Sequence, residues 1–201
     1  ATRVGVRAAE AARSMAGFLT RRRLGRPHVT LKLALSLDGA AAMADGRSMW
    51  ITGPEARAHA HLERSRHETI LVGRGTWETD SPTLDVRLAG LEDRSPLRVV
   101  LSGRPDPSAS LRDGARQAQR GEKDERDRPL LVASPQAIAT LPGDHLLIEG
   151  GAQTAAAFLA ADLVDRLLLY RAPVIVGGGR TLPNIGLADL AHAHEIGRAH
   201  V

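Results

Sequence analysis

Residues 31–39 read LKLALSLDG, and this stretch decides the fold class of the chain. Its apolar residues, followed by Asp38-Gly39, are typical of a buried strand that ends at a turn. The stretch also contains Lys32, and a charged side chain in a buried run is costly unless something pairs with it. We therefore predict that an anionic ligand binds at the end of this strand.

The residues after the strand are predicted to form a loop that leads into a helix. Residues 48–53 read SMWITG and bring Ser48 and Trp50 to the start of a helix over 54–65. Thr52 has capping-box spacing from the glutamate three positions later, and the proline between them lies in the first turn, where its missing N–H does no harm.

One face of this helix carries cationic side chains. Arg57, His61 and Arg64 stand at i, i+4 and i+7, a spacing that places them along one side of a helix. We expect Arg57 and His61 to lie on a solvated face. Arg64 is nearest the strand predicted at 68–73 and is the candidate for a functional role.

Strand-length apolar runs alternate with helical segments along the chain. Strands are predicted at 28–36, 68–73, 97–102, 129–133, 145–148 and 166–176. Helices are predicted at 54–65, 135–140 and 152–161. This alternation predicts an α/β fold, a sheet with helices on its faces.

The N-terminal region is predicted to be a helix that stands apart from this pattern. Residues 4–23 have apolar side chains near helical spacing, and the pattern ends near Gly25 and Pro27. We interpret residues 1–26 as a linker helix and residues 27–201 as one domain.

Composition narrows the class of protein. The 201 residues are 43% apolar, enough for a sizeable core, and contain no cysteine, which excludes disulfides, thiolate nucleophiles and cysteine metal sites. No apolar run approaches the roughly 20 residues of a membrane span, and the N-terminus lacks a signal-peptide core. The first residue is Ala, consistent with a piece of a longer chain. We expect a cytoplasmic protein with no membrane partner.

Charge and histidine spacing exclude other classes. The net charge is +4, and Lys32 and Lys123 are the only lysines among many arginines, which favour phosphate and carboxylate ligands. Few aromatic residues accompany the single cluster 21–23, so we expect no nucleic-acid partner. The histidines lack metal-ligand spacing, and Ser48 has no triad partners. Metal, metalloenzyme and hydrolase interpretations are therefore excluded.

Three glycine sites follow apolar runs. Gly73-Arg74-Gly75-Thr76 and Glu149-Gly150-Gly151 each lie between a strand and the next segment, where backbone amides can receive phosphate. Neither is the fingerprint GxGxxG or the phosphate loop GxxxxGK[ST]. Residues 177–179 form a further close-approach site or, equally, a flexible hairpin. Residues 80–87, polar and broken by proline, are predicted to form a functional loop.

Several segments together carry a family resemblance that extends over residues 4–190. They are 26–34 (RPHVTLKLA), 38–39 (DG), 48–52 (SMWIT), 71–76 (LVGRGT), 79–87 (TDSPTLDVR), 96–101 (PLRVVL) and 148–151 (IEGG). In order and spacing they resemble the reductase domain of the bacterial bifunctional riboflavin biosynthesis protein. The resemblance implies a dihydrofolate-reductase-like α/β fold, a mixed sheet flanked by helices. It also implies reduction of 5-amino-6-(5-phosphoribosylamino)uracil with NADPH, which turns the ribosyl chain into a ribityl chain.

The resemblance also assigns site residues. The catalytic pair would be Lys32 and Glu149. Substrate-contacting positions would be Lys32, Ser48, Arg64, Leu84, Arg87 and Glu149. Cofactor-binding positions would be Ala34, Trp50, Thr76, Asp80, Gly150, Gly151, Ala152, Gln153 and Thr154, with Arg74 as a candidate partner of the 2′-phosphate. It further implies a homodimer and a deaminase domain, or a separate deaminase, that supplies the phosphorylated pyrimidine substrate.

The chain departs from the family pattern at three points. Ser81 and Ser102 stand where aspartate is usual, and a serine there supplies no charge. The zinc deaminase signatures are absent from this cysteine-free chain. The chain stops where relatives continue into a closing strand, which would shorten the domain at its C-terminus. Two rivals therefore remain beside the reductase: a paralogue that reduces another pyrimidine or pterin-like substrate, and a non-catalytic NADP-binding module.

Overall fold

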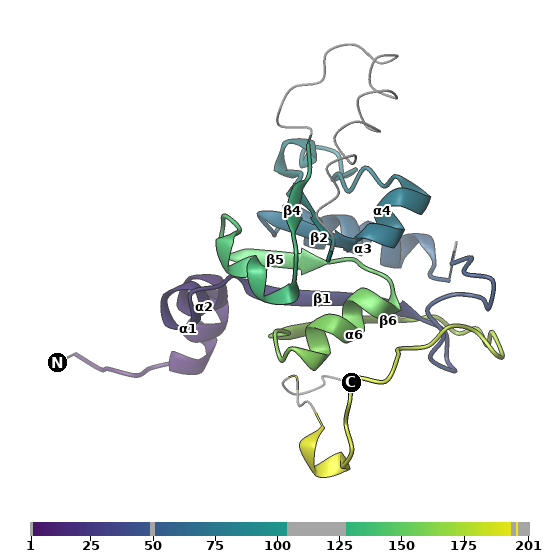
Figure 1. Ribbon diagram of the computed structural model, residues 1–201. Coiled ribbons are helices and arrows are strands. Elements are labelled where there is room, and N and C mark those ends of the chain that lie inside the picture. The colour runs from purple at the N-terminus through teal and green to yellow at the C-terminus, as the bar shows by residue number, and fades with distance from the viewer. Residues whose placement is uncertain (1, 49–50, 104–127, 194–195, 197–201) are drawn as a thin grey trace.

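A six-stranded sheet forms the centre of the molecule (Figure 1). The computed structural model describes residues 2–48, 51–103, 128–193 and 196. The strands are β1 (His28–Leu35), β2 (Thr69–Gly73), β3 (Leu97–Leu101), β4 (Leu130–Val132), β5 (His145–Ile148) and β6 (Arg166–Arg171). They lie in the order β4-β3-β2-β5-β1-β6. The α/β class predicted from the alternating pattern is therefore confirmed.

Every pairing between these strands is parallel, although the resemblance implied a mixed sheet. Parallel neighbours need crossover connections, and several of the described helical segments lie in them. Antiparallel pairing occurs in the described residues as an isolated bridge between Ala42 and Arg180. β6 ends at Arg171, five residues before the predicted end, because Pro173 cannot donate to a strand ladder.

The helices match the sequence prediction in part. They are α1 (Ala8–Ser14), α2 (Ala16–Leu24), α3 (Pro54–Arg64), α4 (Arg74–Asp80) and α6 (Ala152–Ala160), with 3-10 turns at Glu92–Arg94, Pro135–Thr140 and Leu190–His192. The single N-terminal helix predicted over 4–23 is wrong, because the chain leaves helical geometry at Met15 (φ −108°, ψ 17°). The pattern also missed α4, a short helix that packs Trp77 against the core.

Strand alternation sends β1 side chains to two different layers. Val29, Leu31 and Leu33 pack with Phe158 of α6 in the larger core cluster. Lys32 therefore points to the opposite face, where α3 and α4 lie (Figure 1). A second, smaller cluster on that face is formed by Ile70, Val72, Leu84, Val100 and Leu147, with Trp77 packed against it.

The connections after β2 and β5 leave the sheet on opposite faces, and the region outside the carboxyl ends of these two strands is here called the crevice. After β2 the chain enters α4, which packs on the smaller cluster, and after β5 it enters α6, which packs on the larger one. Adjacent parallel strands whose following helices take opposite faces form a topological switch point. In open α/β sheets, ligands bind there, outside the carboxyl ends of the strands.

Contacts of Gly17 and Arg21 hold α2 at the opposite, amino-terminal edge of the sheet. Gly17 is buried against the imidazole of His145, and a Cβ at this position would overlap the ring. Arg21 donates to the carbonyl oxygens of Ala139 (3.2 Å) and Leu141 (2.9 Å) and also to that of Gly143. α1, by contrast, has no buried residue. None of the helices in the described residues is long and apolar enough to span a membrane.

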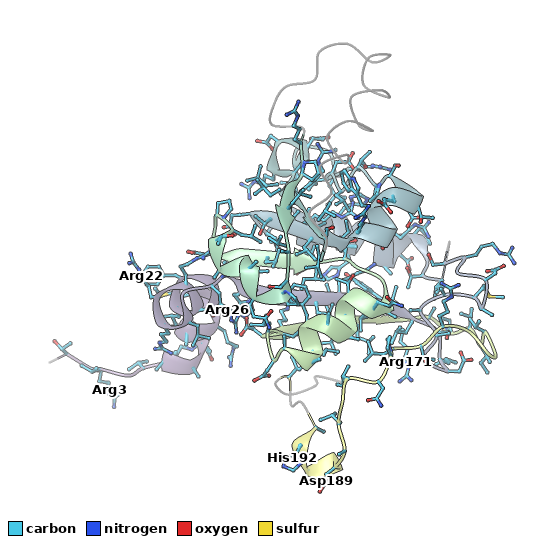
Figure 2. All side chains as sticks on the ribbon, viewed as in Figure 1. Arg3, Arg22, Arg26, Arg171, Asp189 and His192 are labelled. Carbon is cyan, nitrogen blue, oxygen red and sulfur yellow. The ribbon has the colours of Figure 1, made fainter. Side chains whose placement is uncertain are left out.

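Arg26 joins the end of this N-terminal segment to the sheet (Figure 2). Its guanidinium makes two contacts with Asp165, Nη1–Oδ2 at 2.6 Å and Nη2–Oδ1 at 3.0 Å. Asp165 Oδ2 also accepts from the backbone N–H of Val29 at 2.8 Å. One carboxylate thus fixes both Arg26 and the start of β1.

We expect Asp165→Ala to destabilise the domain because it leaves the guanidinium of Arg26 and the amide of Val29 without this partner. The expected cost is about 2 kcal/mol, or about 4–8 °C in Tm. Asp165→Asn, which keeps an oxygen for Val29, should lose about half as much. Thermal unfolding of both variants checks this. A wild-type Tm for Asp165→Ala would contradict the role of the carboxylate.

Candidate active site

Glu149 lies directly after β5, at the carboxyl edge of the sheet beside the crevice. Its two oxygens accept from Arg64, Nε–Oε1 at 2.7 Å and Nη2–Oε2 at 3.0 Å. Its side chain is 9% exposed. Burial alone would raise the pKa of Glu149, but the hydrogen bonds and charge of Arg64, with the charges of Lys32 and His61, lower it. Glu149 is therefore a buried carboxylate at neutral pH.

Lys32 approaches the same point from β1. Its Nζ lies 5.7 Å from the centre of the Tyr170 ring, within cation–π range. Its charge also contributes to the low pKa of Glu149. The sequence predicted an external anion as the partner of Lys32. The chain itself supplies a carboxylate and an aromatic face nearby.

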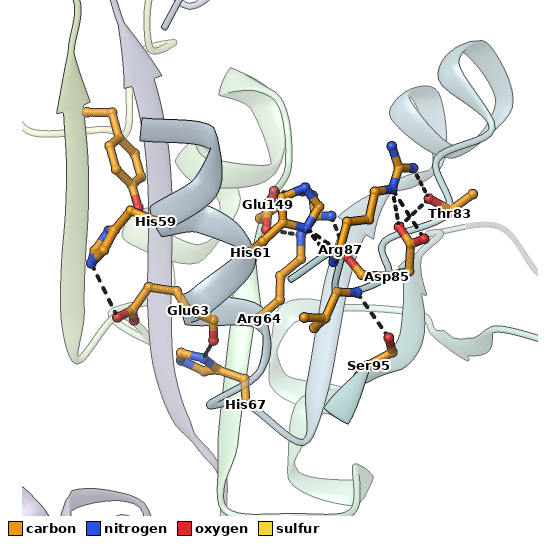
Figure 3. A network of polar contacts seen from close by, with 12 residues as sticks. His59, His61, Glu63, Arg64, His67, Thr83, Asp85, Arg87, Ser95 and Glu149 are labelled. Atoms are coloured by element: carbon orange, nitrogen blue, oxygen red, sulfur yellow. Dashed lines mark hydrogen bonds and ion pairs between the residues drawn. The ribbon is translucent and has the colours of Figure 1, made fainter. Parts of the chain in front are cut away.

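α3 provides the other cationic groups of the site (Figure 3). Arg64 spans two elements, because its Nη1 donates to the carbonyl oxygen of Asp85 at 2.9 Å while its other nitrogens bind Glu149. His61 was expected on a solvated face, and this expectation is wrong: the residue is half-buried and its Nδ1 lies 3.1 Å from the same carbonyl oxygen. Arg57 is also half-buried and donates to the carbonyl oxygen of Thr52 at 2.7 Å.

Residues 83–87, here called the arm, lie beside α3 (Figure 3). Leu84 and Val86 are buried, at 3% and 2% exposure, and anchor the arm in the core. Leu84 has a φ of 56°, an uncommon left-handed conformation for a leucine. The resemblance assigns Leu84 to the substrate site. Because its side chain is in the smaller core cluster, only its backbone is available to a ligand.

The polar side chains of the arm bind one another. Thr83 Oγ1 donates to Asp85 Oδ1 at 2.6 Å, and Arg87 donates from Nε to Asp85 Oδ1 at 3.1 Å and from Nη2 to Thr83 Oγ1 at 2.7 Å. Burial alone would raise the pKa of Asp85, but the contacts with Thr83 and Arg87 lower it. The guanidinium of Arg87 is thereby held in place while it remains exposed.

On the other side of the crevice, the starts of two helices lie close together, and their glycines with Thr76 and Thr154 are here called the cradle. Gly73 precedes α4, and Gly151 precedes α6. A Cβ at Gly73 would overlap Thr154 Oγ1, and one at Gly150 would lie 2.5 Å from Thr154 Cβ. One at Gly151 would lie 3.8 Å from Thr76 Oγ1. The glycines at 73 and 150 therefore make room for the Thr154 side chain, and the first amides of α6 beside them can receive an anion.

The structure thus brings together most of the predicted cofactor positions. Gly150, Gly151, Ala152, Gln153 and Thr154 form the turn and first residues of α6, opposite Thr76 of α4. Ala34 lies two residues beyond Lys32, on the same face of β1. Asp80 is exposed at the far end of α4, and Ser48 is exposed in the loop after β1. Trp50 lies outside the described residues.

A hollow of about 420 Å³ adjoins the cradle. It is lined by Arg74, Glu78, Leu101, Ser102 and Gly103. Arg74 Nε lies 2.8 Å from Glu78 Oε1. Sequence reasoning singled out Arg74 and Ser102 but missed Glu78, because it did not predict α4. Leu101 and Ser102, on the other side of the hollow, lie at the end of the strand predicted at 97–102.

The third glycine site is a close approach rather than a flexible hairpin. Asp38 accepts from Ser36 Oγ at 2.6 Å, and from the backbone N–H groups of Val176 (3.1 Å) and Gly177 (2.9 Å). The hydroxyl of Ser36 and these two amides lower the pKa of Asp38 to about 2. A Cβ at Gly179 would lie 2.5 Å from the carbonyl oxygen of Ala42. The Asp-Gly turn at 38–39 is therefore hydrogen-bonded to the segment after β6.

Comparison with known proteins places this site in a family. The model of the RibD C-terminal domain matches residues 27–194, most of the chain. The chain belongs to this family. Riboflavin biosynthesis protein RibD of Mycobacterium tuberculosis (strain CDC 1551 / Oshkosh) is 37% identical over 183 residues, which cover 88% of this chain and 51% of that protein. The chain therefore spans about half the length of this relative.

Solved structures of RibD proteins share the fold. RibD of Acinetobacter baumannii, form 1, aligns with a TM-score of 0.72 at 30% identity, covering 91% of this chain and 56% of the other. A diaminohydroxyphosphoribosylaminopyrimidine deaminase/5-amino-6-(5-phosphoribosylamino)uracil reductase of Thermotoga maritima aligns with a TM-score of 0.70 at 27% identity, covering 92% and 56%. The dihydrofolate-reductase-like α/β fold that the resemblance implied is thus confirmed.

The described part of this RibD-family chain contains no cluster of three or more histidine, aspartate or glutamate residues arranged for a metal ion. The polar groups at the crevice are instead paired with one another, carboxylate to guanidinium. This arrangement can bind and orient a polar substrate and stabilise a cation. The cradle beside it can hold a diphosphate.

We expect Gly73→Ala to lower the free energy of unfolding by about 1–3 kcal/mol, because the added methyl group would overlap Thr154 Oγ1. The backbone at Gly73 (φ −73°) accepts alanine, so the overlap is the cause. In a Thr154→Ala background, Gly73→Ala should cost almost nothing. Chemical denaturation of the four chains checks this coupling.

Gly150→Ala provides the matched control. Its methyl group would lie 2.5 Å from Thr154 Cβ, an atom that alanine retains. The cost of Gly150→Ala should therefore persist in the Thr154→Ala background. Equal rescue of both glycine variants would show that the contacts at Thr154 are wrongly assigned.

Proposed function

We propose that this chain is an NADPH-dependent reductase that converts 5-amino-6-(5-phosphoribosylamino)uracil into 5-amino-6-(5-phosphoribitylamino)uracil in riboflavin biosynthesis. Membership of the RibD C-terminal domain family supports this, as does the likeness to the bifunctional Thermotoga protein. The observation that carries the proposal is local: the buried carboxylate Glu149 and the cradle glycine Gly150 are consecutive residues at the crevice.

The cradle would bind the diphosphate part of a dinucleotide. Gly150 and Gly73 make room for the side chain of Thr154, and Gly151 lies near Thr76. Together with the amino end of α6, these groups would hold the cofactor diphosphate. Arg74, beside the hollow that adjoins the cradle, is our candidate partner for the 2′-phosphate that distinguishes NADPH from NADH.

The chain's own residues would handle the substrate at the other end of the crevice. When bound, NADPH would supply the hydride for C1′ of the ring-opened substrate, whose imine nitrogen has taken up the one proton that the reduction needs. Glu149, ionised at neutral pH, stabilises the cationic imine. Lys32 orients the sugar hydroxyls or donates the proton.

The two arginines of the site would have different roles. Arg64 already binds Glu149 and Asp85, so it holds the carboxylate rather than reaching far into the crevice. Arg87 is 63% exposed and is steadied by Asp85 and Thr83. Arg87 is therefore the candidate for the substrate phosphate, and Ser48 for a polar group nearby.

We further propose that residues 27–201 form the reductase domain of a cytoplasmic homodimer and that residues 1–26 link it to a deaminase domain or lie beside a separate deaminase. The match covers only 51% of the Mycobacterium tuberculosis relative, and the Thermotoga protein carries both activities in its name. The exposed apolar residues of this segment, among them Met15 between the two helices and Phe18 of α2, suit contact with a further domain.

The decisive test measures NADPH oxidation with 5-amino-6-(5-phosphoribosylamino)uracil by the loss of reduced-nicotinamide absorbance. Substrate-dependent oxidation is expected. A folded chain that oxidises NADPH only with another pyrimidine or a pterin would favour the paralogue. A chain that binds NADPH but turns over none of these substrates would favour the non-catalytic module. The uncharged Ser81 and Ser102, at positions where aspartate is usual, would then be the expected cause.

We expect Glu149→Gln and Lys32→Ala to lower kcat by about 100-fold each, because both groups act on charge that develops at the reacting carbon. The dissociation constant for NADPH, measured by fluorescence, should change by less than about twofold, since neither residue lies in the cradle. Glu10→Gln on the exposed α1 is the control. Wild-type turnover in either site variant would remove the role assigned to that residue.

A further inference from the structure

His61 is a titratable group of the site that the proposed mechanism does not use. It lies on α3 one turn before Arg64, so both side chains reach the arm from the same face of the helix. Its Nδ1 is 3.1 Å from the carbonyl oxygen of Asp85 and 3.3 Å from the backbone nitrogen of Arg87 (Figure 3). The ring thus meets the arm at two backbone atoms.

Either form of the neutral ring ties α3 to the arm. When Nδ1 carries the proton, it donates to the carbonyl oxygen of Asp85, which also accepts from Arg64 Nη1 at 2.9 Å. When Nδ1 is unprotonated, it accepts from the N–H of Arg87. Both contacts involve the backbone, so they position the arm without depending on its side chains.

We propose that His61 is a positioning residue for the reaction: it locks the arm to α3, so that Arg64 stays against Glu149 and Arg87 faces the crevice. This rests on the proposed function, in which Glu149 and Arg87 contact the substrate. The left-handed φ of Leu84, 56°, places a strained residue in the arm, and strain persists only where neighbouring contacts hold it, His61 among them.

The charges around His61 favour its neutral form. Burial lowers the pKa of His61, and the cations Arg64 on α3 and Arg87 on the arm lower it further. The carbonyl of Asp85 and the carboxylate of Glu149 after β5 act in the opposite direction but do not prevail. Protonation below the ordinary pKa of 6.5 would add a third cation and remove the acceptor for the N–H of Arg87.

The pH dependence follows from the sign of this shift. A histidine whose pKa is lower in the folded chain stabilises the fold above its ordinary pKa, and this contribution is lost as the pH falls through the lowered value. The hold on the arm should weaken over the same range. An acid limb in kcat/KM is therefore expected below the ordinary histidine pKa of 6.5, on the acid side of the profile.

Three substitutions at His61 test the lock. His61→Asn places an amide near the position of Nδ1, and His61→Gln places one near the position of Nε2. His61→Ala leaves no polar group at either position. We expect His61→Asn to keep kcat/KM for the phosphorylated pyrimidine within about threefold of wild type. His61→Gln and His61→Ala should lose about 5- to 20-fold. NADPH affinity should not change in any variant, and the acid limb should disappear in His61→Asn.

Hydrogen exchange of the peptide covering residues 83–88 gives a readout that is independent of activity. Exchange should be faster in His61→Ala and His61→Gln than in wild type and His61→Asn. His59→Ala is the matched control, because His59 faces Tyr170 of β6, with Nδ1 2.7 Å from its hydroxyl oxygen, and does not contact the arm. It should leave exchange at 83–88 unchanged.

The outcomes separate the two proposals. If wild type shows no turnover, the proposed function fails, and the exchange comparison alone decides whether His61 holds the arm. Equal exchange at 83–88 in wild type and His61→Ala overturns the lock in either case. Where turnover is measurable, a loss in His61→Asn as large as that in His61→Ala also overturns it.

Discussion

The contact between Arg64 and Glu149 is the constraint on which the site depends. A carboxylate with so little exposure is costly to bury unless its oxygens are paired, and a bidentate guanidinium satisfies both with fixed geometry. Because Arg64 belongs to α3 and Glu149 follows β5, the pair sets how the helix lies on the sheet. Arg64 also donates to the carbonyl oxygen of Asp85, so the arm is bound to the same guanidinium.

The topology of the sheet joins two different kinds of chemistry at one turn. Glu149 points toward α3, while Gly150 and Gly151 lead the chain into α6 on the other face. The backbone of Glu149 is itself held by a bond from its N–H to the carbonyl oxygen of Leu71 at 3.0 Å. A charged side chain and a row of amides are thus fixed relative to each other by the covalent chain.

Much of this arrangement follows from local sequence patterns. The apolar run around Lys32 predicts β1, and the glycines after residue 148 predict the turn into α6, because strand alternation and backbone freedom are local properties. Contacts between distant segments are not local. The helical spacing of His61 predicted a solvated side chain, because the sequence does not show that the arm packs beside it. The burial and positive φ of Leu84 also depend on distant contacts. α4 was missed because packing of Trp77, rather than helix propensity, stabilises it.

The shortness of β5 has a mechanical consequence. Its first residue, His145, lies under Gly17 of α2, and the residue after its last is Glu149. Four residues of extended backbone span only about 13 Å, and a hydrogen-bonded strand between two neighbours hardly stretches. α2 therefore contacts one end of a short, stiff strand whose other end positions the carboxylate. A displacement of α2 against His145 would act on the same strand that carries Glu149.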